Sequence, residues 1–309
     1  MEKQQACFKT KVGGQALIEG VMMRGPQKMC LAVRQPNGEI YTEVSDVHTH
    51  AWQKWPLVRG VASLVSSLAT GYKCLMKSAD IGLTEDAAQP DKFDQWVEKH
   101  FGEKGSKFVM ALASVLGIVL ALGLFMYLPT FLVGLLDKAV PLGWGKTLLE
   151  GLVKIGVFVA YLAIVSRMPD IKRVFSYHGA EHKTIACYEA GEELTPENAR
   201  KHSRFHPRCG TSFILIVLVI SILVSSLLPW GSTGLRVLYK LLLLPVVMGV
   251  SYELIQFCGR HDNPFTKAVS APGLWLQRLT TNEPDNSMLE VAIAAVNPVL
   301  PQHKEDAAW

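Results

Sequence analysis

The sequence predicts a mainly α-helical, polytopic membrane protein with four transmembrane helices and a small cytoplasmic N-terminal unit that contains β-strands. Of its 309 residues, 49% are hydrophobic and only 19% are charged, whereas a soluble domain usually carries about 25% charged residues. Four apolar stretches have about the 20 residues that a bilayer-crossing helix needs. Near the N-terminus, the Asn37-Gly38 dipeptide stands between two extended runs and predicts a β-hairpin.

The N-terminal unit begins with this hairpin. Its strands are expected over 31–34 and 39–44. Upstream, glycines punctuate residues 12–26, where they are expected to permit tight turns or close backbone contact. The alternative for that segment is a substrate or partner role for Glu19 and Arg24.

A helix is expected to follow, from Pro56 to about Ala79, because proline is favoured in a first helical turn. Its apolar stripe suits two arrangements equally. The helix could lie on the cytoplasmic leaflet, or it could be an ordinary core helix packed on the hairpin. The stripe consists of Leu57, Val61, Leu64, Val65, Leu68 and Leu75.

The predicted spans contain few ionisable residues. Glu150 and Lys154 are four residues apart, share a helix face and can pair. Glu253 is a carboxylate inside a span, where such groups normally face protein or water. Lys and Arg concentrate between the second and third spans, so that segment and both termini are expected on the cytoplasmic side. The spans are expected over 108–136, 148–165, 213–230 and 235–258.

These elements divide the chain into six segments. After the last span we expect a turn, a short amphipathic piece around Trp275 and a final helix over 288–296. The segments are a cytoplasmic N-terminal unit (1–84), a polar linker (85–106), the first two transmembrane helices (107–166), a cytoplasmic segment rich in His, Glu and Cys (167–211), the last two transmembrane helices (212–259) and a cytoplasmic C-terminal segment (260–309).

The segment 167–211 holds the residues best suited to chemistry. His178 and His182 are one helical turn apart and can direct two imidazoles at one cation. The order His-x-x-Glu-His is that of inverted zincins, which makes Glu181 a candidate general base. Zn²⁺ or another divalent transition metal needs three or four N, S or O ligands. The candidates that could complete the site are His206, Cys209 and Glu253.

Composition narrows the function classes. The formal net charge of +4 is small for this length, so no nucleic-acid partner is expected. The apolar content argues against intrinsic disorder. The six cysteines lie in segments assigned to the cytoplasm or its membrane border, where metal binding or catalysis is favoured over disulfides.

The preferred hypothesis is metal-dependent hydrolysis of a peptide or lipid-linked substrate near the membrane surface. A structural metal and a metal-free hydrogen-bonded network are the alternatives for the site. For the whole chain, the alternatives are a non-catalytic scaffold in membrane-protein insertion or assembly, and a transporter with Glu253 on its ion path. Membrane lipids are expected partners, and other membrane proteins are possible ones.

Three long motifs resemble the YqhQ-like (DUF1385) family of bacterial integral membrane proteins of unknown function. They are residues 13–26, residues 175–183 together with 206–213, and residues 271–278. The resemblance covers almost the whole chain. It implies a bacterial inner-membrane location and a metal-dependent enzyme without an established reaction, and it supplies neither a substrate nor a precedent for the fold.

Overall fold

The computed structural model describes residues 10–47, 55, 58–83, 108–109, 111–207, 209–261 and 263–300. Over this part of the chain, the protein is mainly helical with one small antiparallel sheet near the N-terminus, as the sequence predicts. The predicted linker over 85–106 and the predicted helix start at Pro56 lie outside the described residues. The described residues form two compact units: unit 1 from those within 1–83, 162–217 and 245–309, and unit 2 from those within 84–161 and 218–244.

The sheet confirms the predicted hairpin, β3-β4, and adds two more, β1-β2 and β2-β3. Gly38 adopts a φ of 88° between the last two strands, in the left-handed region that glycine enters without strain. The chain also turns at Glu19, whose φ is 52°, so the glycine-punctuated segment is itself a hairpin. The strands, paired antiparallel in chain order, are β1 (Gly13–Leu17), β2 (Gly20–Arg24), β3 (Lys28–Arg34) and β4 (Ile40–Asp46).

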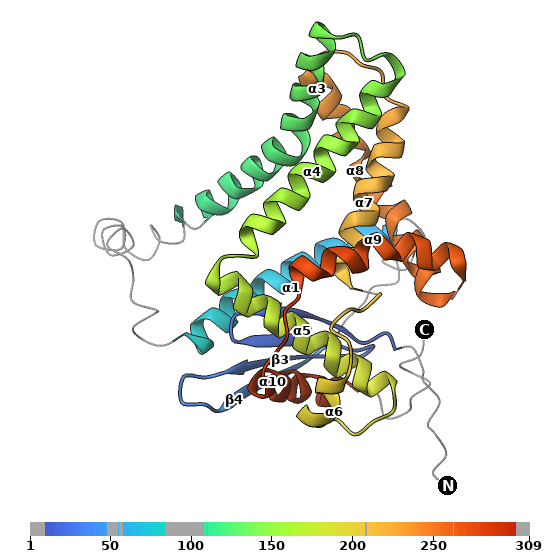
Figure 1. Ribbon diagram of the computed structural model, residues 1–309. Coiled ribbons are helices and arrows are strands. Elements are labelled where there is room, and N and C mark those ends of the chain that lie inside the picture. Colours follow the sequence, from blue (N-terminus) through green and yellow to red (C-terminus); the bar gives the residue numbers. More distant parts are fainter. Residues whose placement is uncertain are drawn as a thin grey trace. The chain divides into compact units, whose positions relative to one another are not determined.

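Helices make up most of the remaining described residues (Figure 1). Residues 111–122 are helical and lead into a π-helical turn, η2 (Gly123–Tyr127). The other helices are α1 (Val58–Gly82), α3 (Leu128–Ala139), α4 (Lys146–Val165), α5 (Pro169–Glu189), α6 (Pro196–Lys201), α7 (Gly210–Ser226), α8 (Thr233–Arg260), α9 (Pro264–Thr280) and α10 (Asn286–Val296), with 3₁₀ turns η3 (Gly143–Gly145) and η4 (Asn297–Val299).

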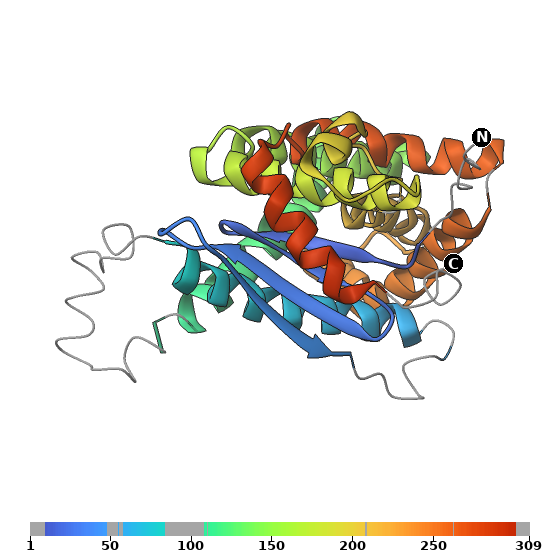
Figure 2. The same ribbon diagram turned by 90° about the horizontal axis from the view of Figure 1, so that it is seen from below.

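Helices cover both faces of the sheet (Figure 2). Because successive side chains of a strand point to opposite faces, Met23 packs with α5 and α10, whereas Met22 packs with Cys74 of α1. Figure 2 shows α10 crossing one face of the sheet and α1 lying under the other. Helix α1 packs on the sheet through a face that includes Cys74 and Leu75, whereas Val65 and Leu68 of the predicted apolar stripe are 60% and 64% exposed, so the buried face is not the whole predicted stripe.

The C-terminal helices begin at side-chain caps. The Asn263 side chain accepts a hydrogen bond from the Thr266 backbone N–H at 2.9 Å, and the Thr266 hydroxyl bonds the Asn263 backbone in return. This reciprocal capping box starts α9 at Pro264, so α9 is longer than the short amphipathic piece predicted around Trp275. The Asp285 carboxylate accepts from the Met288 N–H at 2.9 Å and starts α10 close to the predicted position.

Among the described residues, three helices are long and apolar enough to cross a membrane: Ala111–Ala139, Gly143–Val165 and Thr233–Arg260. They correspond to the first, second and fourth predicted spans. The third prediction falls on α7, which is apolar but has 17 residues. At 1.5 Å per residue, α7 extends about 25 Å, against about 30 Å of hydrocarbon. Pro229 follows closely, and helices usually end before the residue that precedes a proline.

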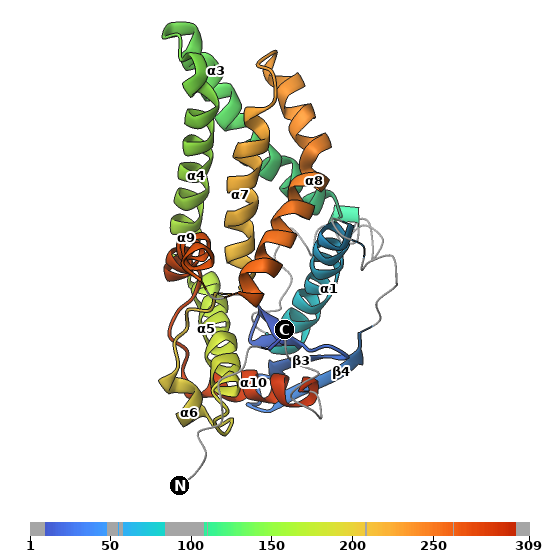
Figure 3. The same cartoon turned by 90° about the vertical axis from the view of Figure 1, so that its right-hand side faces the viewer.

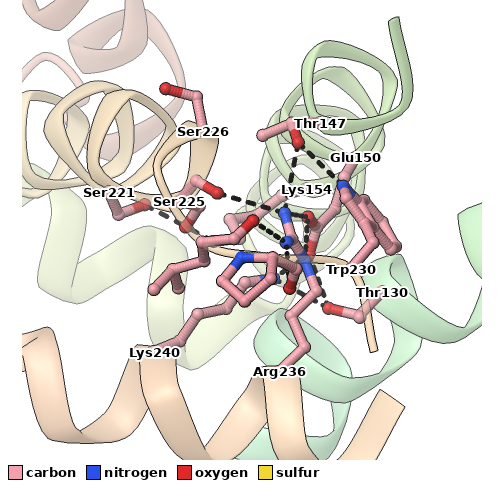
Figure 4. Close-up of polar contacts among 12 residues, drawn as sticks. Thr130, Thr147, Glu150, Lys154, Ser221, Ser225, Ser226, Trp230, Arg236 and Lys240 are labelled. Atoms are coloured by element: carbon pink, nitrogen blue, oxygen red, sulfur yellow. Dashed lines mark hydrogen bonds and ion pairs between the residues drawn. The ribbon is translucent and has the colours of Figure 1, made fainter. Parts of the chain in front are cut away.

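A buried ionic network lies inside unit 2 (Figure 4). The guanidinium of Arg236, which is 1% exposed, binds the Glu150 carboxylate with an Nη2–Oε2 distance of 3.0 Å. The Lys240 ammonium contacts the other carboxylate oxygen, to which the Thr130 hydroxyl also donates. One carboxylate on α4 thus binds two cations on α8.

The expected pair between Glu150 and Lys154 does not form. The Lys154 ammonium instead contacts the Ser221 hydroxyl at 3.4 Å. Arg236 takes the carboxylate because its planar guanidinium presents several N–H donors at once. It also donates to backbone carbonyls around the end of α7, including those of Ser225 and Leu228.

Candidate metal centre

Helix α5 carries the two histidines of the predicted motif. Pro169 stands at its first turn, where the missing N–H of proline costs no helical hydrogen bond. His178 and His182 lie on one side of α5 with their ring centroids 4.4 Å apart. His182 is 1% exposed, whereas His178 is partly exposed and borders the surface.

Backbone carbonyls orient both imidazole rings. His178 Nδ1 lies 2.8 Å from the Thr280 carbonyl oxygen, and His182 Nδ1 lies 2.6 Å from that of Arg204. Because a carbonyl oxygen can only accept, each Nδ1 carries a hydrogen. In the neutral ring, Nε2 then keeps its lone pair, as in metal-binding histidines.

Cys209 completes a group of three donors. Its Sγ lies 3.2 Å from His178 Nε2, and one ligand atom each from His178, His182 and Cys209 lie within 4.8 Å of one another. Burial alone would raise the pKa of the Cys209 thiol, but the charges of both imidazoles outweigh it and hold this pKa well below its usual value. Burial lowers the pKa of His178, yet the thiolate outweighs that effect and raises it to about 9.

Glu181 is buried beside these donors. Burial raises the pKa of its carboxyl above the usual value, against the opposing charges of His178 and His182. Its Oε2 has no hydrogen-bond partner within the described part of the protein. The Gly14 backbone N–H bonds the carboxylate. A Cβ at Gly14 would lie 2.6 Å from the Met22 carbonyl oxygen and 3.0 Å from Glu181 Cδ, so this glycine permits the close contact expected of the glycine-punctuated segment.

The two other candidate ligands have different surroundings. The His206 ring lies 5.6 Å from that of His182, but its Nε2 is 3.7 Å from a Glu189 carboxylate oxygen. Glu253 lies on α8 and forms a two-point ion pair with Arg59 of α1, with an Nε–Oε1 distance of 2.7 Å. The structure therefore brings Cys209 into contact with the histidine pair, whereas Glu253 binds Arg59 instead.

Several supporting residues were not found by sequence reasoning. Gln277 of α9 holds the His206 main chain from both sides, at 2.8 Å to its N–H and 2.7 Å to its carbonyl. Its only sequence signal is that it is polar on the buried face of an amphipathic helix. Nothing in the sequence marks the backbone carbonyls of Thr280 and Arg204 as supports of the site, since every residue carries a carbonyl.

Glu19 has a structural contact. Its carboxylate binds Arg173, with an Nη2–Oε2 distance of 2.6 Å, and accepts from the Tyr177 hydroxyl at 3.2 Å. The β1-β2 turn is thereby tied to α5 directly before His178. This contact agrees with the structural interpretation of the glycine-punctuated segment.

The donor set fits a Zn²⁺-type ion, because imidazole nitrogen and thiolate sulfur are the ligands that zinc prefers. The buried Glu181 carboxylate interacts electrostatically with these groups, but its oxygens are not among the ligand atoms that lie within 4.8 Å of one another. A second group, Cys187, Glu192 and His202, also clusters within 4.8 Å. It is weaker, because Glu192 is exposed and its carboxylate lies 3.3 Å from His202 Nε2, which it can bind without a metal.

Fold and site together define a class: a protein with membrane-type helices that also carries two imidazoles and one thiol whose ligand atoms lie within 4.8 Å of one another. The chain belongs to the family described as "Protein of unknown function (DUF1385)", whose model matches residues 55–302. It is 37% identical to "Uncharacterized protein YqhQ" of Bacillus subtilis (strain 168) over 294 residues, 93% of this chain and 92% of that protein. These matches confirm the family predicted from the motifs. No solved structure is significantly similar to the chain.

Proposed function

We propose that this protein is a metal-dependent hydrolase of the bacterial cytoplasmic membrane that binds a Zn²⁺-type ion through His178, His182 and Cys209. The observation that carries the proposal is the convergence of two imidazoles and one thiol, with both Nδ1 atoms bonded to backbone carbonyls. Two nitrogens and one sulfur leave a tetrahedral ion one further position, as in catalytic zinc sites.

The proposed topology has four membrane passes. In it α7, with its 17 apolar residues, is the third pass, and the exposed Leu227 just beyond it extends the apolar surface. Four passes leave both termini on one side. The concentration of Lys and Arg over 167–208 makes that side cytoplasmic, together with the metal cluster.

Glu181 is the proposed general base. A bound Zn²⁺-type ion would lower the pKa of a water molecule at its open position. The unbonded Oε2 of Glu181 can accept a proton from such a water. Burial raises the pKa of the carboxyl, which favours the protonated form that a general acid needs to return the proton to a leaving group. The partly exposed side of His178 is the route by which substrate would approach.

Metal analysis of the purified protein tests the proposed site. We expect about one Zn²⁺-type ion per chain in the wild type and loss of it in His178→Ala, His182→Ala and Cys209→Ser. His261→Ala is the matched control, because His261 is exposed and lies against Phe257. Equal, near-zero metal in the wild type and in all the variants would refute the metal site.

A second measurement separates a catalytic from a structural ion. In Co²⁺-substituted protein, acetohydroxamate should change the visible spectrum, because an open coordination position can take this ligand. Glu181→Gln should keep both the metal and this response. A spectrum that acetohydroxamate leaves unchanged would indicate four protein ligands and a structural ion.

The non-catalytic scaffold remains the alternative proposal. Polar groups within spans can bind partner helices, and Glu150, Lys154 and Glu253 are the candidates for this in the sequence. In the structure each of these side chains bonds a residue of the same chain. Protein partners that co-purify with His178→Ala and His182→Ala as with the wild type would favour the scaffold.

A further inference from the structure

Helix α9 has two faces of different character. One face is buried, and through Gln277 and Thr280 it holds the main chain of His206 and the ring of His178. A Cβ at Gly273 would lie 2.4 Å from Ser212 Oγ, so α9 packs directly on the first turn of α7. The buried residues are Thr266, Gly273, Leu276, Gln277 and Thr280.

The opposite face of α9 exposes large apolar side chains. Phe265 is 58% exposed and Trp275 is 54% exposed. Ala268 and Pro272 lie between them and are exposed too. The steps of three, four and three residues place all four side chains on one face of a helix. These four side chains form the α9 apolar face.

The α9 apolar face continues the surface of a membrane-type helix. Phe257, near the end of α8, is 42% exposed, and its ring meets that of Phe265 edge-on at 6.4 Å between centroids. Figures 1 and 3 show α9 running crosswise to α7 where the two helices meet. A helix that lies across the end of an apolar helix has the orientation of an interfacial helix.

The charged residues within α9 are all basic. Pro264–Thr280 contains no Asp or Glu, whereas Lys267 and Arg278 are exposed. Before α9, Arg260 is exposed as well, and Asp262 is the one acidic residue between it and the helix. Basic residues that flank an apolar face suit anionic lipid headgroups, and tryptophan is enriched at the membrane–water interface.

We infer that α9 is an interfacial helix whose apolar face lies in the headgroup region of a bilayer that contains anionic phospholipids. The inference needs a membrane but does not depend on the metal. It has a consequence for the proposed hydrolase, because Gln277 and Thr280 on the other face hold the histidine cluster. The cluster would then lie about one helix diameter, ~10 Å, from the headgroups, which suits a membrane-borne substrate.

Spin labels measure where the face lies. The full-length protein is placed in nanodiscs of mixed phosphatidylcholine and phosphatidylglycerol, and labels are attached at Ala268→Cys and at Trp275→Cys, one variant at a time. The background carries Cys7→Ser and Cys258→Ser, since the other cysteines of the described chain are buried. Lys201→Cys on α6 is the control, because Lys201 is exposed on a polar helix.

Labels at 268 and 275 should be more accessible to oxygen than to a water-soluble nickel chelate, and the label at 201 should show the reverse. Changing Lys267 and Arg278 to Gln together should abolish any difference between anionic and purely zwitterionic nanodiscs. Nickel-accessible labels at 268 and 275 would place the face in water and overturn the inference. Strongly immobilised labels with little access to either reagent would mean that protein covers the face, a second copy or a partner, and would overturn it too.

Metal content separates this inference from the proposed function. The labelled variants leave His178, His182 and Cys209 unchanged, so they should keep the metal content of the wild type. A bilayer-facing α9 in a protein without metal would refute the hydrolase alone. A water-facing α9 in a metal-containing protein would refute this inference alone.

Discussion

Glu150→Gln tests the most deeply buried ionic network of the described chain. Gln is nearly the same size as Glu, so the change removes the charge and leaves the volume. Glu150 is 2% exposed, and the cations that bind it, Arg236 and Lys240, are 1% and 6% exposed. The Gln side chain would also replace one carboxylate oxygen by an NH₂ group, whose two N–H groups cannot accept from the Arg236 guanidinium or the Lys240 ammonium.

The expected loss follows from this burial. Removing one partner of a buried ion pair typically costs about 3–5 kcal/mol of the free energy of unfolding, because the remaining charge stays buried without a partner. For a protein in which 1 kcal/mol shifts the unfolding midpoint by about 2–4 °C, the midpoint should fall by roughly 10 °C. Thermal unfolding of the detergent-solubilised protein measures this shift.

Asp137→Asn is the matched control. Asp137 pairs with Lys146 at 2.6 Å in the same unit, but their side chains are 29% and 15% exposed. A pair that water reaches contributes only about 0–1 kcal/mol, so the midpoint should hardly move. Equal shifts in the two variants would show that burial does not set the strength of the network and would refute the reasoning.

Three further predictions concern the sheet, the metal cluster and the last helix. Gly14→Ala should lower the unfolding midpoint and the zinc content, because overpacking costs about 1–3 kcal/mol, whereas Gly13→Ala, whose Cβ meets nothing within 4 Å, should change neither. Zn²⁺ binding at neutral pH should release about one proton, because His178, with a pKa of about 9 in the metal-free protein, is protonated there and must lose its proton to bind. Calorimetry in two buffers of different ionisation enthalpy measures the release. A binding heat that does not depend on the buffer would contradict the prediction. Asp285→Ala should cost about 1 kcal/mol by removing the cap of α10. Burial opposes ionisation of Asp285, but hydrogen bonds from Ser287 and Met288 outweigh it and lower the pKa of the carboxyl in the folded protein. The carboxylate therefore stabilises the fold fully above its unfolded-state pKa, and this stabilisation is lost as the pH falls through its folded-state pKa. The unfolding midpoints of the wild type and of Asp285→Ala should therefore converge at acid pH.

Local patterns predicted much of this protein correctly. The β3-β4 hairpin follows from Asn37-Gly38, since a two-residue preference for positive φ specifies the turn. The neighbouring imidazoles of His178 and His182 follow from their spacing on α5. Three of the expected spans follow from the length of their apolar runs. In each case the deciding interactions join residues a few positions apart, or depend on composition alone.

Tertiary structure decided which distant groups meet. Cys209, His206 and Glu253 are equal candidates in the sequence. In the folded protein the Cys209 thiol reaches His178, whereas Glu253 meets Arg59. Glu150 shares a helix face with Lys154, yet its carboxylate binds Arg236 and Lys240 from α8. The periodicity of the sequence does not predict these pairings, because contacts between residues far apart in the chain depend on how the helices pack. The carbonyls that orient the two imidazoles come from the backbone, which is the same at every position, so only their placement in space gives them a role.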